Sequence, residues 1–375
     1  LETLLQPADR LRLNAAIRAS AHTASACHPP ERCGYSSLAR EVIPNIAPFS
    51  RRKSFLALTQ IQPHDRQPIT GVKDMWAVSS GKGGVGKTFV AANLSVALSR
   101  MGYRVIAVDA DLDGANLHTC LSVPNPQVSL ADFVAGRLSE PEKMVIQTSE
   151  PNLQLIAGTH SNLNRPQPGL ARRVELLRGL RQLSADFVII DLGAGSQPAA
   201  LDYFLVADEG LLVLNPEPTS VENAYSFLRA AFYRRLRLAS RGHGARELVR
   251  QAMDQRNEKG IRTPYDLMRE IEAVDPVEGS RFAQTMRSFR PRIVINEART
   301  AEDIKLGFAV ASVCEKFFGF KANYLGYVNY QDSARESVQA RKPLCDYSPT
   351  SDASIYIQRI AAKLAGTSPR ASTAP

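Results

Sequence analysis

The sequence is poor in the features that build extracellular or membrane-spanning proteins. Its five cysteines are scattered and include no C-x-x-C pair, which argues against a disulfide framework or a zinc site. No apolar run approaches the ~20 residues that a membrane-spanning helix needs. The 37 acidic residues are outnumbered by 46 lysines and arginines, and the net charge of +9 favours anionic partners without choosing among nucleotide, nucleic acid and lipid headgroups. We therefore expect a cytoplasmic protein that is soluble or peripheral to a membrane.

Regular patterning is also missing at both ends of the chain. Residues 1–72 mix Pro, Ser, Arg and His irregularly and contain one short helical stretch, Leu4–Ile17. The segment does not contain the charged and apolar regions of a secretory signal, so we interpret it as a disordered leader or an overextended start. We expect a low-order leader over residues 1–72 and a disordered polar tail over residues 366–375, on either side of one domain.

A phosphate-binding loop lies just inside that domain. Residues 81–88 fit the pattern G-x-x-x-x-G-K-[ST] and read Gly81-Lys82-Gly83-Gly84-Val85-Gly86-Lys87-Thr88. In such a loop backbone N–H groups cradle phosphates, the last lysine reaches the β- and γ-oxygens, and the hydroxyl binds Mg²⁺. A short apolar run precedes the loop, and a helical pattern from Val90 to Met101 follows it, so the helix N-terminus also offers its partial positive charge. The sequence predicts nucleotide binding here.

Apolar strand candidates alternate with helical segments from Lys73 to about residue 365. The expected strands are Met75–Ser79, Arg104–Asp109, Leu153–Ala157, Phe187–Asp191, Gly210–Leu214, Arg292–Asn296 and Tyr324–Val328, and clear helices are Arg172–Leu183 and Val221–Leu238. Buried runs of this kind that alternate with helices indicate an α/β fold, with a mostly parallel sheet covered by helices on both faces. Ligands of such sheets bind at the carboxyl ends of the strands.

Carboxylates follow two of the expected strands at that edge. Asp109 and Asp111 follow one apolar run and Asp191 ends another. Beside a phosphate loop, these residues are placed to hold Mg²⁺ directly or through water. Each could instead cap the next helix, so the metal site stays a hypothesis at this point.

Two further segments leave more than one interpretation open. Between residues 229 and 262 there are ten basic and three acidic residues, which gives a net charge of +7. This charge fits a solvated helix face or a surface that binds nucleic acid, an acidic partner or an anionic membrane.

Near the end, Ile357, Ile360, Ala361 and Leu364 share one helical face. That face suits a last helix packed on the sheet better than a membrane-targeting helix, because its apolar part is short and carries only two basic neighbours.

The loop and the carboxylate segments together resemble the MinD/ParA superfamily of ATPases. The resemblance implies a P-loop NTPase fold of the SIMIBI type. Lys82 makes the loop similar to the family's deviant Walker A form, and the segments 108–112 and 190–195 are similar to its switch I and switch II. The segments 207–209 and 215–220 look closest to the branch that sets flagellar number and placement (FlhG, YlxH or FleN). The resemblance covers residues 73–365, apart from a basic helical insertion at about 239–290.

This resemblance implies a cycle in which two subunits close face to face over two ATP molecules and separate after hydrolysis. It assigns catalytic roles to Lys82, which would reach the partner's phosphates, and to Asp111, which would orient the attacking water. Mg²⁺ would be held by Thr88, Asp109, Asp111 and Asp191. Nucleotide contacts would come from the loop residues Gly81 to Thr88, from Phe89, and from Asn296 at the adenine. Implied partners are a second copy and a regulatory protein, with peripheral membrane contact left open.

Four functions compete on this evidence. The leading hypothesis is a weakly active ATPase switch, stimulated by a partner, that positions or counts a polar structure such as the flagellum. A partition ATPase acting on nucleoid DNA is the alternative, distinguished by salt-dependent binding to nonspecific DNA. An iron–sulfur scaffold lacks its C-x-x-C, since Cys314 and Cys345 lie too far apart. An amide-forming synthetase would need a glutaminase domain, and none is visible in the sequence.

Overall fold

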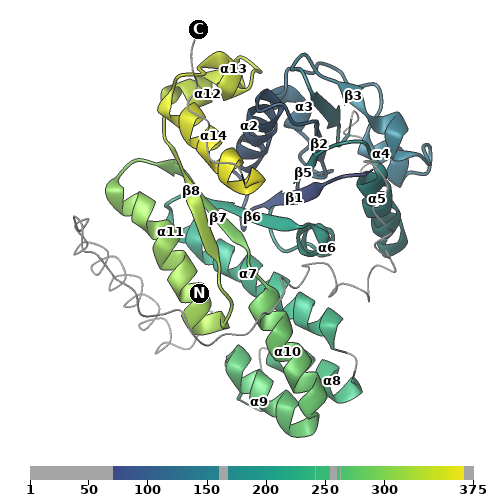
Figure 1. The fold of residues 1–375 in the computed structure, drawn as a ribbon, viewed down its shortest axis with the longest axis vertical. Helices are drawn as coiled ribbons and strands as arrows, with labels where there is room; N and C mark the ends of the chain where they lie inside the picture. The colour runs from purple at the N-terminus through teal and green to yellow at the C-terminus, as the bar shows by residue number, and fades with distance from the viewer. Residues whose placement is uncertain (1–70, 160–167, 241, 254–259, 262, 367–375) are drawn as a thin grey trace, which may run out of the picture.

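The computed structural model describes residues 71–159, 168–240, 242–253, 260–261 and 263–366. The expected leader, except for Gly71 and Val72, lies outside these ranges together with its Leu4–Ile17 helix. The expected tail after Gly366 lies outside them as well. The intervening chain folds around a single eight-stranded sheet (Figure 1).

The sheet has the strand order β3-β4-β2-β5-β1-β6-β7-β8. Its strands are β1 (Asp74–Ser79), β2 (Val105–Asp109), β3 (Ile146–Gln147), β4 (Leu153–Ile156), β5 (Phe187–Asp191), β6 (Glu209–Leu214), β7 (Arg292–Ala298) and β8 (Asn323–Asn329). All neighbours are parallel except β3, which pairs antiparallel with β4 at one edge. Each strand expected from the sequence is present, with ends shifted by at most one or two residues. The two-residue β3 was not expected, because so short a strand has no apolar pattern.

Helices cover both faces of the sheet (Figure 1). The described helices are α2 (Lys87–Arg100), α3 (Leu117–Cys120), α4 (Leu130–Val134), η2 (Pro141–Met144), α5 (Leu170–Gln182), α6 (Pro198–Val206), α7 (Pro218–Ala239), α8 (His243–Met253), α9 (Pro264–Val274), α10 (Pro276–Ser288), α11 (Ala301–Val313), η3 (Cys314–Phe318), α12 (Asp332–Gln339), α13 (Leu344–Tyr347) and α14 (Asp352–Ala365).

The alternation of side chains along each strand divides the core in two. In β1, Met75 and Ala77 join a core cluster that includes α5, α6, α7 and α11, whereas Trp76 and Val78 join a second cluster with α2 and α14. All four side chains are at most 1% exposed. This is the arrangement that a strand buried on both faces requires.

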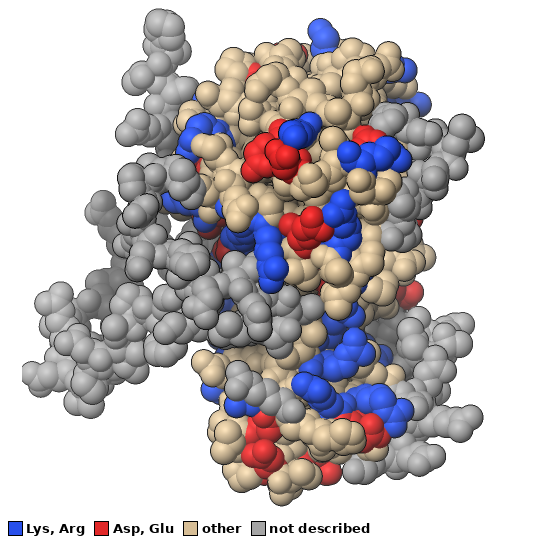
Figure 2. Space-filling model, turned by 90° about the vertical axis from the view of Figure 1, so that its right-hand side faces the viewer, with Lys and Arg blue, Asp and Glu red and all other residues tan. Residues whose placement is uncertain are grey.

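The basic insertion forms a helical lobe below the sheet, made of α8, α9, α10 and the end of α7 (Figure 1). Figure 2 shows blue side chains gathered across this lobe, with red ones at its lower end. Part of the charge is used within the protein, because Arg234 pairs with buried Asp202 at 2.6 Å and Arg250 pairs with Glu247. Arg237 and Arg246 are exposed. The lobe therefore combines paired arginines with a solvated basic surface.

The last helix packs on the domain, as expected. In α14, Ile357, Ile360 and Ala361 are at most 2% exposed and belong to the core cluster with α2. The membrane-targeting interpretation is therefore wrong for this apolar face, since burial leaves it nothing to insert. Among the described residues, no helix combines the length and the hydropathy needed to cross a bilayer.

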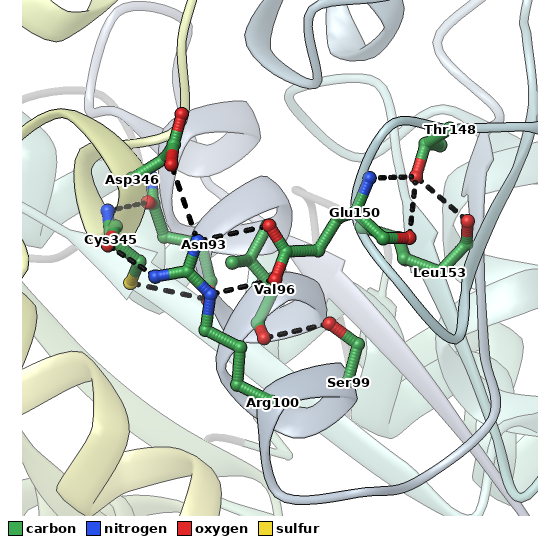
Figure 3. A network of polar contacts seen from close by, with 9 residues as sticks. All are labelled: Asn93, Val96, Ser99, Arg100, Thr148, Glu150, Leu153, Cys345 and Asp346. Atoms are coloured by element: carbon green, nitrogen blue, oxygen red, sulfur yellow. Dashed lines mark hydrogen bonds and ion pairs between the residues drawn. The ribbon is translucent and has the colours of Figure 1, made fainter.

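A polar network ties α2 to the C-terminal part of the chain (Figure 3). The Arg100 guanidinium at the end of α2 donates to both carboxylate oxygens of Glu150, at 2.7 and 2.9 Å, and to the carbonyl of Cys345 at 2.5 Å. Two helical turns earlier in α2, Asn93 Oδ1 accepts a hydrogen bond from the Cys345 N–H at 3.0 Å. Because α2 starts at the phosphate loop, these contacts anchor the far end of the helix that carries the loop.

Candidate functional site

The phosphate loop connects β1 to the N-terminus of α2. Gly86 caps the helix in a left-handed conformation, with φ +81°, and a Cβ there would lie 2.2 Å from the Asn296 amide nitrogen. Gly81 is equally constrained, because a Cβ would lie 2.2 Å from the backbone carbonyl carbon of Asn223 in α7. No acidic residue occupies the first turn of α2. The partial positive charge of the helix N-terminus is thus left for an anion.

Two strand-end aspartates meet beside this loop. β2 and β5 are neighbours, and their register pairs Asp109 with Asp191. Both carboxylates are buried, at 0% and 1% exposure. Lys87, which is 7% exposed, places its ammonium 2.7 Å from Asp191 Oδ1 and 3.9 Å from Asp111 Oδ2. The structure therefore brings together the loop lysine and the three aspartates that the sequence nominated.

Burial sets the protonation of this cluster. It raises the pKa of Asp109 to about 8, and the nearby Asp191 carboxylate adds to the rise. Hydrogen bonds from the N–H groups of Leu117 and Asp111 oppose it. Burial also raises the pKa of Asp191, against the attraction of Lys87. A cation bound beside the two carboxylates would oppose both rises in pKa, because it favours the charged form.

The donor set fits Mg²⁺. Asp191 Oδ2 is buried without a hydrogen-bond partner among the described residues, and the Thr88 hydroxyl lies 3.5 Å from the Lys87 ammonium. Carboxylate and hydroxyl oxygens are the ligands that Mg²⁺ takes in phosphate sites. In the described part of the chain, no three His, Cys, Asp or Glu side chains form a metal cage of their own. A magnesium ion here depends on phosphate and water oxygens for the rest of its shell, as is usual.

Asp111 lies at the open side of the cluster. Its side chain is 21% exposed, and its Oδ1 accepts from the Gly114 N–H at 3.0 Å. A Cβ added to Gly193, in the segment after β5, would lie 3.5 Å from the same oxygen. Asp111 is therefore held by backbone on two sides and faces the region in front of Lys87.

Lys82 is bonded elsewhere. Its ammonium donates to Glu217 at 2.5 Å and to the Thr219 hydroxyl at 3.1 Å, at the start of α7. This bond lowers the pKa of Glu217. Glu217 and Thr219 were not nominated as site residues from the sequence, although they lie in the segment 215–220 quoted for the family resemblance. Contact with Lys82 across 135 residues of chain has no local signal.

Asn296 lies against the loop, two residues before the end of β7. Its amide nitrogen donates to the Val85 carbonyl at 2.9 Å, and the side chain is 4% exposed. Phe89 lies in the first turn of α2 and is half-buried. A second amide was missed: Asn215, at the end of β6, has a buried Oδ1 that lacks a hydrogen-bond partner within the described residues. The neighbouring strands β6 and β7 thus place two amide side chains near their carboxyl ends.

A family model for the CobQ/CobB/MinD/ParA nucleotide binding domain matches residues 76–344. The chain belongs to this family. Membership confirms the expected P-loop fold and the expected ATPase class of this MinD/ParA-type domain. The roles of the individual site residues remain predictions.

Named relatives agree with this assignment. The antiactivator FleN of Pseudomonas aeruginosa is 26% identical over 291 residues, which cover 77% of this chain and 85% of FleN. A protein of Oltmannsiellopsis viridis with the provisional name septum site-determining protein MinD is 33% identical over 161 residues. These residues cover 43% of this chain and 51% of that protein. The solved cell division ATPase MinD of Pyrococcus furiosus is 26% identical with a TM-score of 0.53, over 78% of this chain and 99% of that one.

Proposed function

We propose that this protein is an ATP-dependent dimerising switch that regulates the number or placement of a polar structure, the flagellum. The observation that carries the proposal is the similarity to FleN, which spans most of both chains. It is supported by the second lysine of the loop, since Lys82 is bonded outside the Lys87–Asp191 cluster and is free to serve another nucleotide once Glu217 releases it.

The residues of one subunit bind and orient ATP. Lys87 transfers its ion pair from Asp191 to the β- and γ-phosphate oxygens, while the N–H groups of the loop hold the phosphates. Asn296 keeps Val85 in place and contacts the adenine edge. Thr88, Asp109, Asp111 and Asp191 would hold a Mg²⁺ ion, which would neutralise charge at the phosphates.

Hydrolysis requires the second subunit. Asp111 accepts a hydrogen bond from the attacking water and orients it toward the γ-phosphate. Lys82 leaves Glu217 and Thr219 and donates to the partner's phosphates, where it neutralises the charge that develops in the transition state. Separation of the subunits then resets the switch, and a regulatory protein sets the rate. We place this cycle in the cytoplasm, with peripheral contact at the membrane or cell pole.

Two measurements test the proposal. Light scattering of the purified chain with ATP and Mg²⁺ should show a dimer that returns to monomer as phosphate is released; a monomer at saturating ATP, with no phosphate released, would contradict the switch. Expression in Pseudomonas aeruginosa lacking FleN should restore a normal flagellar count, and the Lys87→Ala variant should not. Failure of the wild-type chain alone there, with dimerisation intact, would remove the flagellar role only.

The basic lobe supports a second candidate, a partition-type ATPase that binds nucleoid DNA. Exposed Arg237 and Arg246 are the observation in its favour. If several phosphates are neutralised, the logarithm of the binding constant for nonspecific duplex DNA must fall steeply with the logarithm of salt concentration. Sedimentation of the ATP-bound protein with DNA and, separately, with anionic liposomes decides between this function and a membrane contact.

A further inference from the structure

An apolar groove lies between α5 and η2, away from the nucleotide site. It encloses about 590 Å³ and its floor includes Leu170, Ala171, Val174 and Pro141. Leu170 is 51% exposed and lies beside the other apolar lining residues. The groove is built into the fold, because Gly179 lets α5 approach η2 so closely that a Cβ would lie 2.1 Å from Pro141 Cγ.

The described chain begins at one end of this groove. The Val72 N–H donates to the carbonyl of Arg181 at 3.0 Å, and Arg181 is next to Gln182, which lines the groove. The groove runs along α5 from Gln182 back to Leu170, about 18 Å at the rise of an α-helix. The point at which the preceding chain is attached therefore lies beside the groove. A segment that ends ten residues before Gly71 can reach any part of the groove, since ten residues span up to ~33 Å.

One stretch of the preceding chain matches the groove in polarity. Residues 51–61 read Arg-Arg-Lys-Ser-Phe-Leu-Ala-Leu-Thr-Gln-Ile, so that three cations precede four large apolar side chains. The border of the groove carries both signs of charge: Glu175 and Arg178 are lining residues, and Glu140 lies between the lining residues Ser139 and Pro141. The present partners of the two glutamates, Arg172 and Lys143, are surface pairs that contribute little and leave carboxylate oxygens available for further cations.

We infer that residues 51–61 of this same chain dock in the groove between α5 and η2, with Phe55, Leu56, Leu58 and Ile61 on its apolar floor and the three cations on the side of Glu140 and Glu175. Because only a short tether joins the segment to Gly71, the effective concentration of the segment at the groove is millimolar. Burial of a modest apolar area is therefore enough for docking. Docking would set the point on the domain from which the first fifty residues extend. The inference does not depend on the proposed flagellar role.

Photo-crosslinking of the full chain tests the docking. With the photoreactive residue p-benzoyl-phenylalanine at position 58, irradiation and mass spectrometry should locate the crosslink within residues 139–141 or 170–182 of the same chain. Mixing tagged and untagged chains separates this outcome from a crosslink between two copies. Crosslinks between copies, crosslinks elsewhere in the chain, or none at all overturn the inference.

A pair of matched variants makes the result specific to the groove. Val174→Glu places a charge on the apolar floor and should reduce the crosslink yield about tenfold, the effect of roughly 1.4 kcal/mol lost from docking. Val277→Glu is the control, because Val277 is 68% exposed on α10 in the helical lobe. Equal yields in the two variants, with thermal unfolding unchanged in both, contradict the inference.

Discussion

At the scale of single residues, the site depends on which cation each carboxylate holds. Asp191 and Asp111 share Lys87, whereas Glu217 holds Lys82, so the two lysines of one loop have separate partners. The division gives each lysine its own expected phenotype, one in nucleotide binding and one in assembly. Three substitutions test it.

Lys87→Ala should reduce ATP affinity at least ~100-fold, because the triphosphate loses its principal charge-assisted donor in a buried site. Isothermal titration calorimetry measures the change. Lys143→Ala, which removes an exposed lysine paired with Glu140, is the matched control and should leave affinity unchanged. Normal affinity in Lys87→Ala would show that the loop is not the phosphate site.

Asp111→Ala should still bind ATP but hydrolyse it ~10²–10³-fold more slowly, since the attacking water loses its acceptor. The ATP-bound dimer should accumulate as a result. Phosphate release and size-exclusion chromatography with light scattering follow the two effects. Hydrolysis at the parent rate would remove Asp111 from the catalytic role.

Lys82→Ala should spare ATP binding by the monomer and weaken ATP-dependent dimerisation, with hydrolysis reduced by ~10³ or more, as for other cationic fingers. Analytical ultracentrifugation with and without ATP detects the assembly defect. Glu217→Gln provides a second variant, because it keeps Lys82 and removes only its counter-charge. Loss of nucleotide affinity in Lys82→Ala would contradict a role across the interface.

At the scale of elements, α2 carries the loop at one end and is anchored at the other. Arg100 connects it to α13 and to the turn before β4, as Figure 3 shows. These partners are far apart in sequence, so the network stabilises the arrangement of elements rather than the helix alone.

Arg100→Ala should lower the free energy of unfolding by about 1–2 kcal/mol, because the Cys345 carbonyl and Glu150 lose a charged donor. Urea denaturation measures it. Arg269→Ala is the control: Arg269 is 76% exposed and pairs with Asp266 three residues away, so its loss should cost under ~0.5 kcal/mol. An equal cost for both would mean that the network does not stabilise the fold.

At the scale of the whole molecule, the last helix closes the core on the α2 face of the sheet. Ile357 is 0% exposed there. Ile357→Ala should destabilise the protein by about 2–4 kcal/mol through lost burial and the cavity that remains. Thermal unfolding and liposome sedimentation are measured together, and liposome binding should not change. Reduced liposome binding with unchanged stability would instead indicate a membrane helix.

The sequence by itself determined the class of fold and most of the site. Apolar runs of this kind indicate a doubly covered sheet, and ligands of such sheets bind where the strands end, so Asp109 and Asp191 could be named beforehand. Asn296 was named from the family resemblance. These signals are local in the chain. The helical lobe was visible only as a basic insertion, because charge alone does not show how three amphipathic helices pack.

Only the tertiary structure decided which of these groups meet. The register of β2 and β5 pairs Asp109 with Asp191, and burial there raises their pKa values. The bond from Lys82 to Glu217 and the burial of α14 also depend on segments distant in sequence. Local patterns specify a segment's conformation and polarity, whereas its partners follow from how all segments share one core.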